Sequence, residues 1–120
     1  MQKTDLTTQK CVPCEGGVAP LTRAEAEEMM QDVNPGWKLS DDATSISRSL
    51  LFGDFKQAMA FINRLAELAE AEGHHPDFLL HGWNKVDVTM STHAIGGLSM
   101  NDLIMAAKID PLYIPAASKS

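Results

Sequence analysis

The sequence predicts an α+β domain in which a single antiparallel sheet is covered by helices on one face. Three segments carry apolar residues at helical spacing, and four shorter segments carry them in alternation. Their order is helix, two strands, helix, two strands, helix, and each pair of strands is close enough in sequence to form a hairpin. Two hairpins with helices between them favour one sheet covered on one side. At 120 residues, the chain has the size of one domain.

Each expected helix has a recognisable beginning and end. The first, residues 22–32, begins with a Thr-x-x-Glu capping box and is followed by an Asn-Pro-Gly turn. The second and longest, residues 54–73, begins with Asp-x-x-Gln, carries a broad apolar stripe and ends at a glycine. The third, residues 99–110, begins at a serine and is ended by a proline.

The four expected strands form two hairpins. The first pair is 37–39 and 44–52, and the second of these strands places its apolar residues on one face and its serines on the other. The other pair is 78–80 and 85–91, and strand 85–91 is the clearest because valine, valine and methionine alternate with polar residues. Periodicity does not predict the order of these strands in the sheet.

The composition excludes several classes of protein. The net charge is −6, from 10 basic and 16 acidic residues, which argues against binding to nucleic acid or to an anionic membrane. A neutral, planar small molecule remains compatible with this charge. We find no apolar stretch that could span a membrane and no secretory signal, and we expect a cytoplasmic protein.

The two ends of the chain differ from its centre. We expect a flexible arm at residues 1–20, a domain at 21–114 and a loose tail at 115–120. Within the arm, Cys11 and Cys14 form one Cys-x-x-Cys pair. Our first interpretation is that this cysteine pair has no catalytic role. The alternatives are half of a metal site that another chain or a histidine completes, and a redox pair.

Histidines supply the strongest functional signal. His74, His75 and His93 fall in one 20-residue window together with His81, which we expect to be a surface residue. Imidazole both donates and accepts protons near neutral pH. Pro76 holds His75 in an extended conformation, so the adjacent rings of His74 and His75 should diverge and should not bind one metal ion.

The spacing Glu70-x3-His74-His75-Pro76-x6-Trp83-x9-His93-x8-Asp102 resembles the active-site signature of the pterin-4a-carbinolamine dehydratases. The stretch from residue 91 to residue 102, with its Thr-His, its Gly-Leu and its downstream Asp, adds to the match. The resemblance covers roughly residues 21–109. It implies a four-stranded antiparallel sheet with three helices on one side.

The resemblance also implies an activity, which is loss of water from a tetrahydropterin that carries a hydroxyl on carbon 4a. His74 and His93 look like the acid–base pair, and His75 looks like an assisting or pterin-contacting residue. The expected contacts to the substrate come from the remaining positions, namely Glu70, Pro76, Trp83, Thr92 and Asp102.

Several of these positions have a second explanation. Glu70 could be a solvated helix residue, Asp102 could serve only to cap the third helix, and Trp83 could be a buried aromatic of the sheet. The reaction requires neither a metal ion nor another cofactor. The pterin substrate itself suggests a link to phenylalanine hydroxylase.

Two other functions remain open from the sequence. A metallohydrolase could use His74, His93 and a carboxylate, although the spacing does not match a known zinc motif. A non-catalytic binding module is the other, because some relatives of this family act as protein partners. We further expect a homodimer or homotetramer, since strand 85–91 has no proline to block pairing and helix 100–109 has more apolar surface than one core requires.

Overall fold

The computed structural model describes residues 19–113, except for the side chain of His93. The helices and strands follow one another in the order that the sequence predicts, and there are also short 3₁₀ segments. In chain order they are α1 (Arg23–Met29), η2 (Met30–Asp32), β1 (Lys38–Leu39), β2 (Ile46–Leu51), α2 (Phe55–Glu72), β3 (Asp77–His81), β4 (Lys85–Met90), η3 (His93–Ile95), α3 (Met100–Ile109) and η4 (Asp110–Leu112).

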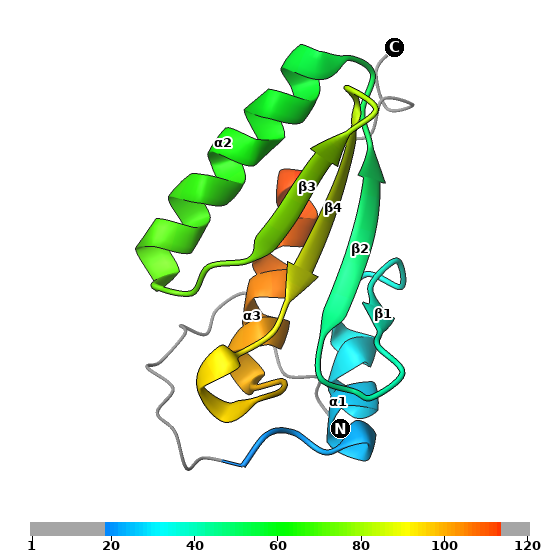
Figure 1. Ribbon diagram of the computed structural model, residues 1–120, viewed down its shortest axis with the longest axis vertical. Helices are drawn as coiled ribbons and strands as arrows, with labels where there is room; N and C mark the ends of the chain where they lie inside the picture. Colours follow the sequence, from blue (N-terminus) through cyan, green and yellow to red (C-terminus); the bar gives the residue numbers. More distant parts are fainter. Residues whose placement is uncertain (1–18, 114–120) are drawn as a thin grey trace.

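The four strands form one antiparallel sheet in the order β1-β2-β4-β3 (Figure 1). Both expected hairpins are present, since β1 pairs with β2 and β3 pairs with β4. The two hairpins join through β2 and β4, with Ile46 opposite Met90 and Leu51 opposite Lys85. Strand 85–91, which we considered as a free edge, is therefore central, and β1 and β3 form the edges.

One face of the sheet carries the core. The inward residues of β2 and β4 are buried as predicted, and they pack with apolar residues of α2 and α3 such as Phe61 and Leu103. Burial of each large apolar side chain contributes about 1.5–3 kcal/mol, so this layer is the main source of stability. Figure 1 shows α3 behind the sheet and α2 alongside β3. The predicted α+β fold is confirmed.

The helix caps largely follow the sequence signals. Thr22 Oγ1 accepts from the Glu25 N–H at 3.1 Å, and Glu25 Oε1 accepts from the Thr22 N–H at 2.8 Å. At the start of α2, Asp54 accepts from the Gln57 N–H as expected, but the Gln57 side chain accepts from the N–H of Gly53 instead of that of Asp54. The first helix is also shorter than predicted, because its last turn tightens into η2.

The third helix is almost completely enclosed. Every apolar residue from Leu103 to Ile109 is buried within the chain, and only Met100 at the start is exposed. The apolar surface that we assigned to an oligomer contact is thus used inside the monomer, and that argument for assembly was wrong. None of the helices between residues 19 and 113 is long and apolar enough to cross a membrane.

Candidate active site

The candidate site begins where α2 ends. Gly73 adopts a left-handed conformation with φ +68° at the C-cap of α2, and the chain then turns through His74 and His75 into β3. The Nε2 atom of His74 lies 2.7 Å from Oδ1 of Asp102, at the start of α3. The His74 side chain is 14% exposed and that of Asp102 is fully buried. A hydrogen on Nε2 is therefore donated to the carboxylate, and Nδ1 becomes the ring nitrogen that can exchange a proton with a ligand.

The carboxylate of Asp102 has three hydrogen-bond partners among the described residues. Besides His74, its Oδ2 atom accepts from Thr92 Oγ1 at 2.8 Å and from the backbone N–H of Ser99 at 3.0 Å. Its position in the first turn of α3 is also favourable for a negative charge, by about 0.3–1 kcal/mol. One carboxylate thus caps the helix, as the capping explanation predicted, and it also orients an imidazole.

His75 points to a different element. Its Nε2 atom lies 2.7 Å from Oε2 of Glu70 on α2, and the side chains are 61% and 78% exposed. The adjacent histidines therefore diverge, as the extended geometry predicted. Among the described residues, no group of three or more His, Cys, Asp or Glu side chains could hold a metal ion.

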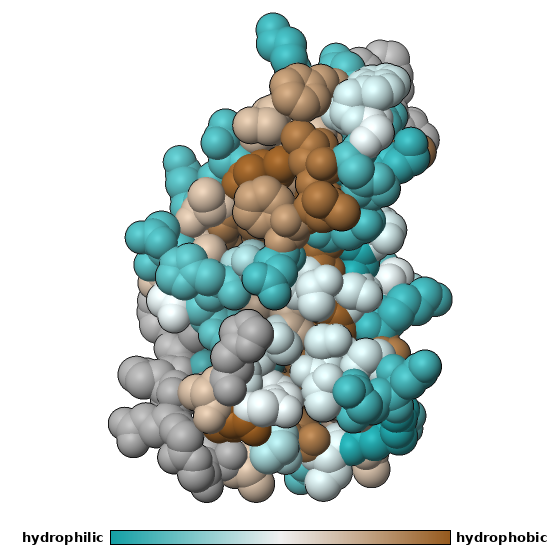
Figure 2. All heavy atoms as spheres, viewed as in Figure 1, coloured by the Kyte–Doolittle hydropathy of each residue, from teal (hydrophilic) through white to brown (hydrophobic). Residues whose placement is uncertain are grey.

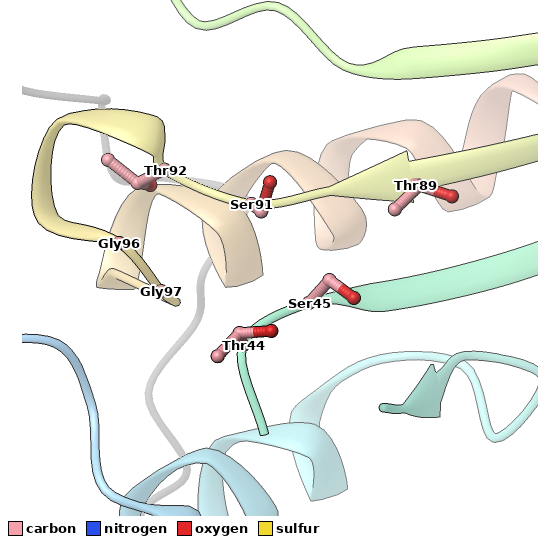
Figure 3. A pocket seen from close by; sticks show the side chains of 7 residues that line it. All are labelled: Thr44, Ser45, Thr89, Ser91, Thr92, Gly96 and Gly97. Carbon is pink, nitrogen blue, oxygen red and sulfur yellow. The ribbon is translucent and has the colours of Figure 1, made fainter. Parts of the chain in front are cut away.

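A hollow of about 400 Å³ opens beside Thr92, and we call it the hydroxyl hollow (Figure 3). Its walls come from the segment that enters β2, from β4 and from the loop that follows β4. The lining residues are Thr44, Ser45, Thr89, Ser91, Thr92, Gly96 and Gly97. Its volume is within the range of about 300–1,000 Å³ that small-molecule sites have.

The loop after β4 carries His93. Thr92 and Gly97 form a β-bridge across its base, so residues 93–96 project as a short closed loop that borders the hydroxyl hollow. The backbone of His93 begins the 3₁₀ turn η3 within this loop. The side chain of His93 lies outside the described part of the structure.

A second, smaller hollow of about 150 Å³ lies between α2 and β3, and we call it the α2–β3 hollow. It is mostly apolar, and Glu70 and His75 stand at its polar side. Its lining residues are Leu65, Ala66, Ala69, Glu70, His75, Pro76 and Phe78.

Comparison with known proteins decides the family. The family model described as pterin 4 alpha carbinolamine dehydratase matches residues 19–112. The chain belongs to this family. A relative from Nitrosomonas eutropha is 49% identical over 92% of this chain and 95% of its own length, and one from Halorhodospira halophila is 51% identical over 89% and 96%. The names of both give pterin-4-alpha-carbinolamine dehydratase as a provisional assignment.

Two solved structures are also similar. The first is a transcriptional coactivator/pterin dehydratase from Brucella melitensis, with a TM-score of 0.73 and 35% identity over 79% of this chain and 99% of that one. The second is a pterin dehydratase-like protein described as a RuBisCO assembly factor in the alpha-carboxysome. Its TM-score is 0.57, with 26% identity over 67% of this chain and 92% of that one.

Within the dehydratase signature, Trp83 is the position that the fold separates from the others. It lies in the turn between β3 and β4, at the opposite end of the hairpin from His74 and His75. Its side chain is 59% exposed, so the reading of a buried sheet aromatic was wrong. Its φ of +59° is left-handed, which costs a non-glycine residue roughly 1–2 kcal/mol. His81 is exposed, as predicted, and pairs with Asp87 at 3.1 Å.

Sequence reasoning missed two parts of the candidate site. Phe78 was assigned only to a short strand, although it also lines the α2–β3 hollow beside His75. The hydroxyl hollow was missed as well. The Ser and Thr residues at outward positions of β2 and β4 could have indicated this hollow. However, alternation of polar and apolar residues is equally typical of an ordinary strand with one solvated face.

Proposed function

We propose that this protein dehydrates 4a-hydroxytetrahydropterin to quinonoid dihydropterin, as a hydro-lyase that uses histidine acid–base catalysis. The observation that carries this proposal is the buried network in which Asp102 binds both His74 and Thr92. It connects an oriented imidazole to the hydroxyl hollow, and the loop that carries His93 borders the same hollow.

The reaction needs two proton transfers. The bond between carbon 4a and its hydroxyl breaks, a proton joins the leaving hydroxyl to give water, and a proton leaves nitrogen 5 as the double bond between carbon 4a and nitrogen 5 forms. We assign these transfers to His74 and His93, without specifying which residue donates. Asp102 is a positioning residue, because it holds the Nε2 side of the His74 imidazole and leaves Nδ1 for proton transfer.

The remaining signature residues supply the surroundings of the substrate. Among the described residues that line the hydroxyl hollow, none has a charged side chain, and the hydroxyls and backbone groups there suit the amide and amino edge of a neutral pterin. Glu70, His75 and Pro76 border the α2–β3 hollow on the other side of His74. We propose that Thr92 acts mainly through Asp102, since its hydroxyl is already donated to that carboxylate.

The product of this reaction is the oxidised form of a hydroxylase cofactor. We therefore propose that the protein acts in the cytoplasm and returns the pterin used by aromatic amino-acid hydroxylases, with phenylalanine hydroxylase as the expected functional partner.

The direct test is a stopped-flow measurement of carbinolamine decay with freshly generated substrate. The purified protein should accelerate dehydration well above the uncatalysed rate, and a His74→Ala, His93→Ala double variant should not. General acid–base groups contribute about 10²–10⁴-fold each, so the difference is large. Equal decay with and without the wild-type protein would refute the proposal.

A non-catalytic binding module is the second candidate. The observation in its favour is the similar solved structure that is described as a RuBisCO assembly factor. The affinity of such a module for its partner should not change when His74 and His93 are replaced. An enzyme should lose its activity on the same replacement.

A further inference from the structure

A second hydroxyl continues the hydrogen-bond network around Asp102. Thr92 Oγ1 lies 2.8 Å from Oδ2 of Asp102, and it also lies 2.8 Å from Oγ of Ser99. Thr92 is only 5% exposed and Asp102 is fully buried, so water competes little for these bonds. Because Asp102 also binds Nε2 of His74, three hydrogen bonds in a row connect Ser99 to that imidazole.

The number of hydrogens fixes the direction of this chain. A hydroxyl has one hydrogen to donate, and a carboxylate only accepts. Thr92 donates its hydrogen to Asp102, so in its contact with Ser99 it must accept, and Ser99 is the donor. A hydroxyl that accepts one hydrogen bond is polarised and donates a stronger one. Ser99 therefore acts on Asp102 twice, through Thr92 and through its own backbone N–H at 3.0 Å.

The same pair of hydroxyls closes the loop that carries His93. Thr92 directly precedes His93, and Ser99 follows the loop as the N-cap of α3. The backbone N–H of Thr92 donates to the carbonyl of Gly97 at 2.8 Å, and the contact with Ser99 ties the loop a second time. Figure 3 shows Thr92 at one end of this loop, with Gly96 and Gly97 on the returning arm. The backbone at His93 thus starts from a point that Ser99 helps to fix.

The surroundings of Thr92 suit a network of neutral hydroxyls. Every described residue that lines the hydroxyl hollow is a serine, a threonine or a glycine. In Figure 2, this end of the sheet is covered mostly by pale, weakly polar side chains, and the apolar ones gather over β3 and the adjoining part of α2. No charged side chain of the described lining competes for the hydroxyl of Thr92.

We propose that Ser99 is a positioning residue of the candidate site. Its hydroxyl directs the hydrogen of Thr92 onto Asp102, which in turn holds the hydrogen of His74 on Nε2. It also ties the base of the loop that carries His93 to the same network. The inference rests on the proposed function for its effect on the reaction, whereas its effect on the ring of His74 requires no catalysis.

Helix capping is the alternative role of Ser99, and suitable variants separate the two roles. Glycine is nearly as good an N-cap as serine, but it has no hydroxyl. Ser99→Gly therefore removes the donor to Thr92 and keeps the start of α3, whereas Ser99→Thr keeps both the hydroxyl and the cap. Thr22→Gly is the matched control, because the hydroxyl of Thr22 caps a different helix, α1.

Stopped-flow kinetics with fresh carbinolamine measure the effect on the reaction. We expect Ser99→Gly to lower kcat by about three- to tenfold, as for the loss of one neutral hydrogen bond, with KM nearly unchanged. Ser99→Thr and Thr22→Gly should keep the wild-type rate. Thr92→Val should lower kcat at least as much as Ser99→Gly, and the double variant no further, because both hydroxyls act in one chain. Wild-type kcat in Ser99→Gly, or losses that multiply in the double variant, would overturn the proposal.

Nitrogen-15 NMR of the His74 ring tests the positioning without catalysis. The two ring nitrogens have different shifts according to which of them carries the hydrogen, and spectra at alkaline pH observe the neutral ring. We expect Ser99→Gly to raise the population with the hydrogen on Nδ1 by about three- to tenfold. Thr92→Val removes the partner hydroxyl and should act in the same direction, and Thr22→Gly should match the wild type.

The two measurements together separate failure of this inference from failure of the proposed function. If the wild-type protein does not dehydrate the carbinolamine but Ser99→Gly changes the His74 tautomer, the proposed function is rejected and the positioning role stands. If the wild type dehydrates it and the tautomer is the same in Ser99→Gly and Thr92→Val, the positioning role is rejected. Circular dichroism checks that each variant is folded.

Discussion

At the scale of single residues, the candidate site contains two histidine–carboxylate pairs that differ in their burial. His74 binds a fully buried carboxylate, and His75 binds one that is 78% exposed. A buried, hydrogen-bonded carboxylate fixes the ring it contacts, whereas an exposed pair contributes only about 0–1 kcal/mol because water competes for it. The structure therefore makes His74 the better oriented of the two.

We expect His74→Ala and His93→Ala each to slow catalysed dehydration by about 10²–10⁴-fold, because each removes one acid–base group. Circular dichroism should show an unchanged fold. His81→Ala is the control, since His81 is exposed at the opposite end of β3 from His74. Near wild-type rates in both active-site variants would contradict our assignment.

Asp102→Asn should lower kcat and change KM less. The loss of kcat should be at most that of His74→Ala, about 10²–10⁴-fold. The amide has the size of the carboxylate but no longer holds the Nε2–H of His74 through a charge. Asp87→Asn is a matched control, because Asp87 pairs with the exposed His81. Full activity of Asp102→Asn at every pH would leave Asp102 with its capping role alone.

Metal removal should leave the activity unchanged. His74 and His75 bind carboxylates on different helices, and proton transfer is sufficient for the reaction. The test is exhaustive dialysis against a chelator, with metal analysis before and after. Activity that disappears and returns with zinc would instead favour the metallohydrolase.

At the scale of elements, the turn between β1 and β2 is held by one carboxylate. Asp42 Oδ1 accepts from the hydroxyl of Thr44 at 2.6 Å and from that of Ser40 at 2.8 Å. These bonds, that of Thr44 above all, hold the pKa of Asp42 below its ordinary value of 3.8. Since the charged form makes these bonds, the turn is fully stabilised above that value and loses this contribution as the pH falls through the lowered pKa.

Thr44→Val should therefore raise the pKa of Asp42 toward 3.8, because the largest cause of the shift is removed. NMR titration of the Asp42 carboxyl between pH 2 and 6 measures it. Ser49→Ala, on the strand that follows the turn, should leave the titration unchanged. A Thr44→Val curve equal to that of the wild type would show that another contact holds the carboxylate.

At the scale of the whole molecule, the free edge of β3 predicts assembly. We expect light scattering at micromolar concentration to give two or four times the 13.1 kDa mass of one chain. Leu79→Lys, which adds a charge to an exposed apolar position of this edge strand, should shift this mass toward that of the monomer. Ser49→Lys on β2 should not. A wild-type mass near that of one chain would contradict the prediction.

The sequence alone determined the elements and their type. Caps such as Thr22 with Glu25 and the terminator Gly73 depend on neighbours three or four residues away, so local pattern is sufficient to predict them. The divergence of His74 and His75 was also a local consequence, of Pro76 and of the extended chain.

Only the tertiary structure decided the strand order, the partner of each histidine and the position of Trp83. The pairing of β2 with β4 joins segments far apart in the chain, and it moves strand 85–91 from the edge to the centre. The contact of His74 with Asp102 likewise spans 28 residues and depends on the packing of α3 against the end of α2. Local periodicity cannot predict such contacts, because they depend on how the apolar faces of separate helices and strands pack together in one core.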